Sequence, residues 1–146
     1  MNYEKELILM VGPVGSGKTT FAKSLKTSTS IRISQDEMGK EGHRYEFCDA
    51  LEAGIPRIIV DRMNFNVKQR RWYINAARSF GYCVTIMEME YCPVQCASRV
   101  SQRENHPTIE SGNIKLANKI IKMYKDNYQA PKPSEYDNYN LIEMDR

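Results

Sequence analysis

Residues 12–19 read GPVGSGKT, a glycine-rich loop that ends in a lysine and a threonine. An apolar run, Glu6–Val11, precedes this loop, and a segment with helical spacing begins at Lys18. A strand, this loop and a helix are the context that the G-x-x-x-x-G-K-[ST] motif requires, because the loop's N–H groups and the helix N-terminus then face one anion. A glycine-rich turn that binds nothing would not need all of these features together. The loop therefore predicts a site for the phosphates of a nucleotide.

The motif gives individual residues of the loop expected roles. Lys18 is expected to reach the β- and γ-phosphates, and the Thr19 hydroxyl is expected to ligate Mg²⁺. The glycines let the loop wind so that successive N–H groups point inward. The residues expected to bind the nucleotide in this part of the chain are Gly12, Val14, Gly15, Ser16, Gly17, Lys18, Thr19 and Thr20.

Beyond the loop, short apolar runs alternate with segments of helical spacing. The expected strands are 6–11, 31–34, 57–61, 82–89 and 139–143, and the expected helices are 18–25, 45–53, 68–80, 93–103 and 114–124. Strands that alternate with helices pair in parallel through right-handed crossovers, with helices on both faces of the sheet. The sequence thus predicts an α/β fold with a parallel sheet of about five strands, in a single domain spanning residues 1–146. Ligands of such sheets bind beyond the carboxyl ends of the strands.

The composition excludes several other classes of protein. The 146 residues are 41% hydrophobic and 27% charged, which suits a globular domain and argues against disordered, collagen-like and coiled-coil chains. No apolar run approaches the roughly 18–20 residues of a membrane span, and the charged start does not resemble a signal peptide. We therefore expect a cytoplasmic protein without a membrane partner. The net charge of +3 is too small to indicate a nucleic-acid partner by itself.

Two carboxylates follow the second expected strand. Asp36 would project into the cleft near the γ-phosphate, where it could accept a proton from an attacking hydroxyl or hold a magnesium-bound water. The alternative is an aspartate that caps a helix or stabilises a turn. The nearby phosphate-binding motif favours the catalytic role for Asp36, with Glu37 as the competing carboxylate.

The third expected strand ends in a second group of polar residues. Asp61 is placed to orient the waters of a metal ion, and Asn64 could hold an oxygen of the substrate or of a phosphate, although turn and cap roles are the alternative. Arg62, Arg70 and Arg71 cluster after this strand. Such a cluster is usually a solvated face, but here it borders the mouth of the cleft and could follow a polyanion.

Two arginines on a later helix suggest a mobile element. Arg99 and Arg103 are four residues apart and so share one face of the helix expected at 93–103. Enzymes that transfer phosphoryl groups need cations that close over the transferring group, so the pair predicts an arginine-bearing lid. The alternative is a pair of solvated arginines on a polar face.

The expected helix 68–80 carries aromatic residues at helical spacing. Trp72, Ala76 and Phe80 recur every four residues along it. We expect Trp72, Tyr73 and Phe80 to belong to the core rather than to a platform that stacks nucleic-acid bases.

Four stretches together resemble a known family, the small P-loop kinases that phosphorylate 5′-hydroxyl ends of nucleic acids. These stretches are 12–20, 34–39, 59–64 and 99–103. The resemblance implies a P-loop NTPase fold, ATP and Mg²⁺ as cofactors, and transfer of the γ-phosphate to a 5′-hydroxyl end of DNA or RNA. It implies that Asp36 is the general base and that Asp61 and Asn64 occupy the strand-end positions of the family. It also implies that Arg103 contacts the β- and γ-phosphates from the lid, with Arg99 beside it.

The chain departs from this family at the acceptor side. Gln35 stands where the family often has arginine, and Gly39 stands where the family's phage polynucleotide kinase has an arginine for the 3′-phosphate of its substrate. Lys40 and Arg44 are nearby cations that could replace that arginine, and Arg62 is a further candidate for the acceptor. These departures bear on the acceptor more than on the reaction.

Three functions therefore stay open from the sequence. The favoured one is a polynucleotide 5′-hydroxyl kinase, and the runner-up is a kinase of a small metabolite, nucleoside or modified base on the same scaffold. These differ in salt dependence, because only a nucleic-acid acceptor releases many counterions on binding. The third is a nucleotide-binding module without catalysis, against which Asp36 and Arg103 argue.

Overall fold

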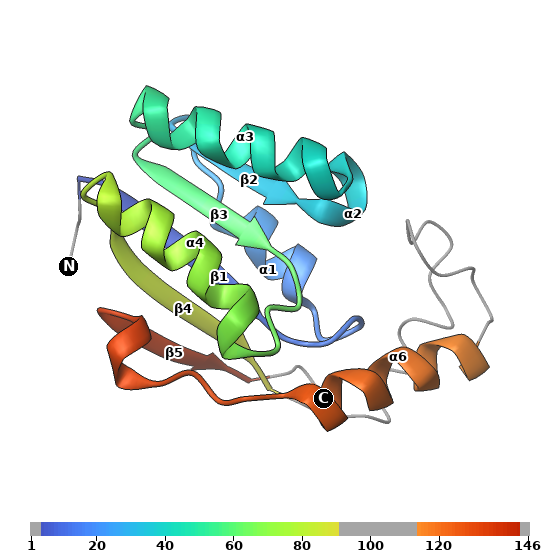
Figure 1. The fold of residues 1–146 in the computed structure, drawn as a ribbon. Helices are drawn as coiled ribbons and strands as arrows, with labels where there is room; N and C mark the ends of the chain where they lie inside the picture. The colour runs from blue at the N-terminus through green and yellow to red at the C-terminus, as the bar shows by residue number, and fades with distance from the viewer. Residues whose placement is uncertain (1–3, 91–113, 144–146) are drawn as a thin grey trace.

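Five strands pair side by side, all parallel, in the part of the chain that the structure describes. The computed structural model describes residues 4–90 and 114–143. The strands are β1 (Glu6–Val11), β2 (Ser30–Ser34), β3 (Arg57–Asp61), β4 (Cys83–Met89) and β5 (Asn138–Ile142). The sheet has the order β2-β3-β1-β4-β5, which confirms the predicted parallel sheet (Figure 1).

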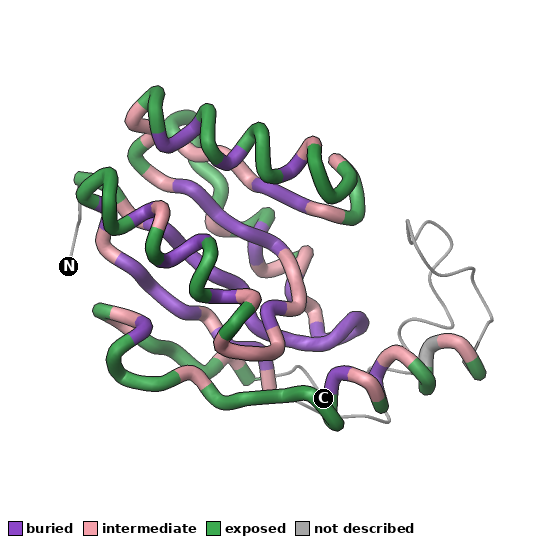
Figure 2. The backbone as a smooth tube through the Cα atoms, in the orientation of Figure 1, coloured by how far each residue is buried: buried purple, intermediate pink, exposed green. Residues whose placement is uncertain are grey.

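Helices cover both faces of this sheet, and one further helix extends from its end. The helices are α1 (Lys18–Ser24), α2 (Gln35–Met38), α3 (Lys40–Ala53), α4 (Val67–Ser79) and α6 (Ile114–Asn127), with a 3-10 turn η1 (Pro133–Glu135) before β5. Residues of α3 and α4 pack on Leu7 and Leu9 of β1, whereas residues of α1 pack on Ile8 and Met10, because successive side chains of a strand point to opposite faces. Figure 2 shows the central strands and the inner sides of these helices as the buried part of the molecule, whereas β5 is largely exposed.

Most element boundaries lie within one residue of the expected ones, but the region after β2 differs. A short helix, α2, forms directly after the strand, and α3 begins at Lys40 rather than at residue 45. Gly39 separates the two helices with φ of 80°, a conformation that glycine adopts without strain. The first turn of α3 is largely polar, so apolar spacing alone did not reveal it. The helix expected at 93–103 lies outside the described residues, and α6 continues three residues past the expected end at 124.

The buried face of α4 is not the one expected from its aromatic spacing. Tyr73 is 1% exposed, as expected, but Trp72 and Phe80 are 36% and 43% exposed, so their expected place in the core is wrong. The buried residues follow the spacing i, i+3, i+4 and i+7 of an amphipathic helix, and they include an arginine. They are Arg70, Tyr73, Ile74 and Ala77.

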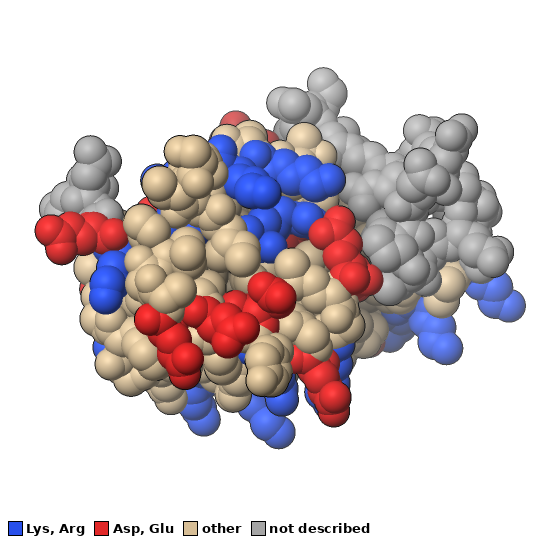
Figure 3. Space-filling model, turned by 90° about the horizontal axis from the view of Figure 1, so that it is seen from above, with Lys and Arg blue, Asp and Glu red and all other residues tan. Residues whose placement is uncertain are grey.

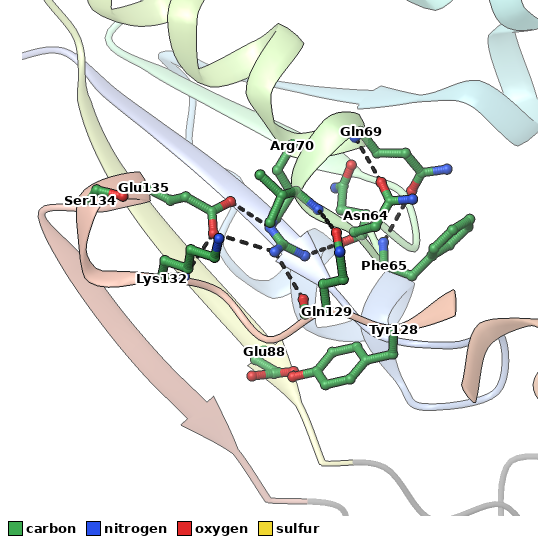
Figure 4. Close-up of polar contacts among 12 residues, drawn as sticks. Asn64, Phe65, Gln69, Arg70, Glu88, Tyr128, Gln129, Lys132, Ser134 and Glu135 are labelled. Atoms are coloured by element: carbon green, nitrogen blue, oxygen red, sulfur yellow. Dashed lines mark hydrogen bonds and ion pairs between the residues drawn. The ribbon is translucent and has the colours of Figure 1, made fainter. Parts of the chain in front are cut away.

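Arg70 joins α4 to the C-terminal segment and does not belong to a cationic surface. Its side chain is fully buried, and its Nε donates to Glu135 Oε1 at 2.7 Å. Its other nitrogens donate to the carbonyls of Asn64 at 2.8 Å and Gln129 at 2.9 Å (Figure 4). A buried charge is tolerated when it is paired and its donors are satisfied. The arginine cluster expected after β3 is therefore reduced to Arg62 and Arg71.

The end of α6 is held against the sheet by a buried carboxylate of β4. Tyr128 and Tyr139 both donate their hydroxyls to Glu88 (Figure 4 shows the first of these contacts). Burial, followed by the hydrogen bond to Glu88, raises the pKa of both tyrosines, so they stay protonated.

None of the helices within the described ranges is long and apolar enough to cross a membrane.

Candidate active site

The glycine-rich loop follows β1 and packs against the ends of two neighbouring strands. Gly12 N–H donates to the carbonyl of Met63 at 3.0 Å, just beyond β3. A Cβ atom at Gly12 would lie 2.8 Å from Ser16 Oγ and 2.9 Å from Met89 Cβ at the end of β4, so only glycine fits. Gly17 precedes α1 with φ of 87°, in the left-handed region. The loop is thereby held over the carboxyl ends of β1, β3 and β4.

Asp61 lies at the end of β3, and its two carboxylate oxygens have different surroundings. Oδ2 accepts a hydrogen bond from Arg32 Nε at 2.9 Å and lies 2.7 Å from Arg32 Nη2. Oδ1 lies 3.6 Å from Lys18 Nζ and is buried without a hydrogen-bond partner among the described residues. One oxygen is therefore committed to Arg32, and the other is open toward the loop lysine.

Arg32 is a site residue that the sequence analysis missed. Burial opposes its charge, but the hydrogen bond and charge of Asp61, followed by those of Glu37, raise the pKa of Arg32 above its ordinary value. Arg32 lies between two isoleucines in the middle of β2, and a cation at the centre of an expected strand was the available signal for an ion pair. Its partner lies on the neighbouring strand, where residue spacing along the chain could not identify it.

Of the two carboxylates that follow β2, only Glu37 is paired with Arg32. Glu37 Oε2 accepts from Arg32 Nη1 at 2.7 Å, so Glu37 is engaged in an ion pair. The side chain of Asp36 forms no hydrogen bond or ion pair within residues 4–90 and 114–143, and Ser34, not Asp36, is the N-cap of α2. The geometry therefore favours Asp36 over Glu37 as the carboxylate available to a substrate, and it removes the capping alternative.

A cleft of about 290 Å³ brings the predicted residues together. Lys18, Asp36, Asp61 and Arg62 all line it. From α6, Ile120 and Met123 contribute an apolar side. The sequence predicted that residues after β1, β2 and β3 meet at the carboxyl edge of the sheet. The contribution of α6 to the cleft became visible only in the fold.

The donors around the loop fit a magnesium nucleotide. Ser16 Oγ and Asp61 Oδ1 are buried and lack hydrogen-bond partners within the described parts of the chain, so each is free to serve a ligand. Thr19 is only partly buried, in the first turn of α1. Mg²⁺ usually keeps several waters and is held by one or two protein oxygens together with substrate phosphates, so the Thr19 hydroxyl as ligand and Asp61 as partner of the waters fit it.

Asn64 has a structural task in the fold. It is fully buried with φ of 47°, and its Nδ2 donates to the carbonyl of Met10 at 2.7 Å. The side chain thus ties the loop after β3 to the end of β1, next to Arg70 (Figure 4). Asn64 Oδ1 is buried without a hydrogen-bond partner among the described residues. The turn role of Asn64 is therefore visible in the structure, and its contact with a substrate or phosphate oxygen stays a prediction.

Arg62 is oriented by a chain of buried side chains. It donates to Tyr73 Oη at 2.6 Å, and this hydroxyl lies 2.6 Å from His43 Nε2. The other ring nitrogen of His43 lies 3.1 Å from the carbonyl of Gly39, which can only accept, so Nδ1 carries the proton and Nε2 accepts from Tyr73. Burial and the nearby charges of Arg62 and Arg44 lower the pKa of His43, which favours this neutral form.

Two of the predicted acceptor residues, Arg44 and Lys40, do not line the cleft. Arg44 is exposed on α3, with its guanidinium 4.9 Å from the ring centre of Trp72. Lys40 is exposed at the start of α3 and lines neither the cleft nor the pocket around Arg44. Arg99 and Arg103, and with them the expected lid, lie outside the described residues.

The strand order and the loop between β1 and α1 together define a kinase-like P-loop domain. The chain belongs to the family described as AAA domain, whose family model matches residues 41–131, more than half of the chain. The match begins after the glycine-rich loop, so the loop and the family match support the same class independently. No curated protein sequence is significantly similar to the chain.

Solved structures share this fold at low sequence identity. Kti12 of Chaetomium thermophilum, in complex with ADP-AlF3, is 16% identical with a TM-score of 0.66, over 95% of this chain and 89% of that one. A gluconokinase from Sinorhizobium meliloti is 12% identical with a TM-score of 0.61, over 100% and 86%. A chain of the Pnkp1/Rnl/Hen1 RNA repair complex is 13% identical with a TM-score of 0.62, over 88% of this chain and 48% of that one. The likeness confirms the P-loop NTPase fold, which kinases of different acceptors share.

Proposed function

We propose that this chain is a kinase that uses ATP and Mg²⁺ to phosphorylate a 5′-hydroxyl end of DNA or RNA. The observation that carries the proposal is the unpaired carboxylate of Asp36, which lines the same cleft as Lys18. A lysine for the phosphates and a free carboxylate for the hydroxyl are the two groups that transfer from a nucleotide to an alcohol requires. Arg62 lines this cleft as well, which suits an acceptor that carries phosphates.

In the proposed reaction, the triphosphate lies along the loop with Lys18 against its β- and γ-phosphates. Thr19 would hold Mg²⁺ directly and Asp61 would orient its waters, and the metal would supply positive charge to these phosphates. Asp36 accepts the proton of the acceptor hydroxyl while the hydroxyl oxygen bonds to the γ-phosphorus and the bond from that phosphorus to ADP breaks. The products are a 5′-phosphorylated end, ADP and a proton. We assign Arg103, with Arg99 beside it, to the charge that develops on the transferring group.

A second candidate is a kinase of a small metabolite, nucleoside or modified base. The observation that favours it is the modest cleft of about 290 Å³, part of whose wall is the apolar pair Ile120 and Met123. A small acceptor would neutralise few cations, so its binding would depend little on salt. A nucleic acid releases counterions for each phosphate contact, so its binding would weaken steeply as salt rises.

The test is transfer of labelled γ-phosphate to a panel of acceptors at two salt concentrations. The panel contains 5′-hydroxyl DNA, 5′-hydroxyl RNA, nucleoside 3′-monophosphates, nucleosides and sugars including gluconate. We expect label at the 5′ end of DNA or RNA, with acceptor affinity that falls steeply as salt rises. Label on a small acceptor alone would establish the second candidate. ATP binding without transfer to any acceptor would contradict both kinase assignments.

A further inference from the structure

A second pocket, of about 450 Å³, lies beside the cleft between α3 and α4. Its charged lining residues are all cations, and no carboxylate is among its lining residues. These cations are Arg44, Arg62, Lys68 and Arg71. We call this set, together with Trp72, the basic pocket.

The cations of the basic pocket are not neutralised by the protein. Within the described residues, no ion pair joins any of the four to a carboxylate. The acidic residues of α3 are all exposed, and none of them lines the basic pocket; they are Glu41, Glu46, Asp49 and Glu52. Figure 3 shows Lys and Arg side chains gathered over one part of the face seen from above, with groups of Asp and Glu side chains beside them. Uncompensated cations in a hollow attract an anion with several charges.

The aromatic member of the basic pocket has an accessible ring in a fixed orientation. Trp72 is 36% exposed, although Phe47 and Tyr73 pack against it with ring centres 5.6 and 5.0 Å away. The Arg44 guanidinium lies 4.9 Å from the ring centre, in the position of a cation over the indole. An exposed, immobilised indole flanked by cations is the arrangement that stacks an unpaired nucleobase while cations hold the adjacent phosphates.

The basic pocket is continuous with the cleft of the proposed kinase site. Arg62 and Gln69 line both cavities, and Asp36 lies in the cleft. An acceptor whose 5′-hydroxyl reaches Asp36 would therefore extend past Arg62 toward Trp72. Arg62 is already oriented along this path by Tyr73 and His43.

From these contacts we infer that the basic pocket binds the single-stranded part of the acceptor next to its 5′ end, with a base stacked on Trp72. This inference rests on the proposed function, since it specifies the acceptor of that same site. The acceptor is then a strand of several nucleotides with unpaired bases at its 5′ end. A mononucleotide or a blunt duplex end would not supply this contact.

Binding can be tested without catalysis, because Trp72 is the only tryptophan of the chain. We expect a single-stranded hexanucleotide that already carries a 5′-phosphate to quench Trp72 fluorescence in a saturable manner. Inorganic polyphosphate, which has charge but no bases, should compete with the strand and leave the emission nearly unchanged. A strand that binds without changing the emission, or a strand that does not bind at all, would overturn the inference.

The kinetic test compares a 5′-hydroxyl hexanucleotide with a nucleoside 3′-monophosphate and with a blunt hairpin. Trp72→Leu should raise KM for the hexanucleotide roughly tenfold or more, well beyond its effect on the mononucleotide, and Trp72→Phe should restore much of the loss. Arg71→Gln should weaken binding of the hexanucleotide, and it should lower the slope of log affinity against log salt concentration by about one. Matched controls are Phe80→Leu, at an aromatic residue of similar exposure on α4, and Lys26→Gln, at an exposed lysine after α1 on the other face.

The outcomes separate this inference from the function on which it rests. Wild-type protein that labels no 5′-hydroxyl end would refute the proposed function, whatever the fluorescence shows. The inference alone would be refuted by a different result. In that case wild-type protein labels the mononucleotide, the hairpin and the hexanucleotide equally well, and neither Trp72→Leu nor Arg71→Gln has a selective effect. The protein would then be a kinase whose basic pocket does not bind the acceptor strand.

Discussion

Arg32 and Asp61, on neighbouring strands, form a buried ion pair. Two nitrogens of the guanidinium contact the same carboxylate oxygen, Oδ2. Nε and Nη2 of Arg32 lie 2.9 and 2.7 Å from Oδ2, while the side chains of the two residues are only 11% and 1% exposed. Because Oδ2 is occupied, Oδ1 is the oxygen that remains for Lys18 and for a metal-bound water. This pair therefore decides which oxygen of Asp61 can take part in phosphate binding.

Arg32→Gln should destabilise the protein, because the buried Asp61 would lose its principal counter-charge. Removing one partner of a buried ion pair typically costs about 3–5 kcal/mol, and the nearby Lys18 places the expected loss at about 3 kcal/mol. Urea unfolding measures this loss. The matched control is Arg57→Gln, whose pair with Glu6 is more exposed and which should lose about 1 kcal/mol or less. Equal losses in both variants would contradict the role of the Arg32–Asp61 pair.

Lys18→Ala should abolish ATP binding and turnover together. Lys18 serves the bound triphosphate as well as the transition state, so both fall when its charge is removed. Equilibrium binding of ATP and the rate of phosphate transfer are the two measurements, with Lys23→Ala on the exposed side of α1 as the control. Normal turnover by Lys18→Ala would mean that the loop is not the ATP site.

Asp36→Asn should leave ATP affinity nearly unchanged and lower transfer by roughly 10²- to 10⁴-fold, the range of a positioned acid–base group. Asparagine keeps the size of the side chain but cannot accept the hydroxyl proton. Single-turnover transfer with saturating ATP gives the rate. Glu37→Gln is the comparison, because Glu37 is bound to Arg32 and should affect the rate much less. If Glu37→Gln proves to be the damaging change, the base has been assigned to the wrong carboxylate.

The stability of the protein should fall as the pH drops below about 6.5, the ordinary pKa of histidine. Burial and the charges of Arg62 and Arg44 lower the pKa of His43 in the folded state. Between the ordinary and the lowered pKa, the unfolded chain therefore binds a proton at this residue that the folded chain does not, and folding is penalised. Above pH 6.5 this contribution to the pH dependence vanishes. Chemical unfolding from pH 5 to 8 should show the decline, and His43→Gln should reduce it.

Arg103→Ala should lower the transfer rate far more than it weakens ATP binding. Negative charge spreads over the oxygens of the transferring group in the transition state, and a cation delivered by a closing lid acts at that moment. The loss could reach roughly 10³-fold, and Arg103→Lys should recover little because an ammonium lacks the planar fork of the guanidinium. Arg99→Ala should be milder. Wild-type single-turnover rates for Arg103→Ala would remove the lid arginine from the mechanism.

Much of the fold and part of the site were predictable because they depend on local patterns. Apolar runs marked the strands within a residue or so, and the glycine-rich motif marked the loop between β1 and α1. The position of Asp36 in the cleft followed from its place after β2, and its catalytic role stays a prediction. The prediction of the buried face of α4 was wrong. The aromatic spacing suggested that Trp72 and Phe80 are buried, whereas the fold buries an arginine together with Tyr73 on that helix.

The sequence by itself determined the order of strands and helices, the phosphate-binding loop and the residues that follow each strand, since short-range spacing and hydrophobicity encode these. Only the tertiary structure decided which charges meet. Arg32 reaches Asp61 because β2 and β3 pair with Ser34 beside Asp61, and Arg70 is buried because the segment around Glu135 returns to cover α4. The free energy of a charge depends on its partners and its exposure to water, and both are set by contacts between residues that are distant along the chain.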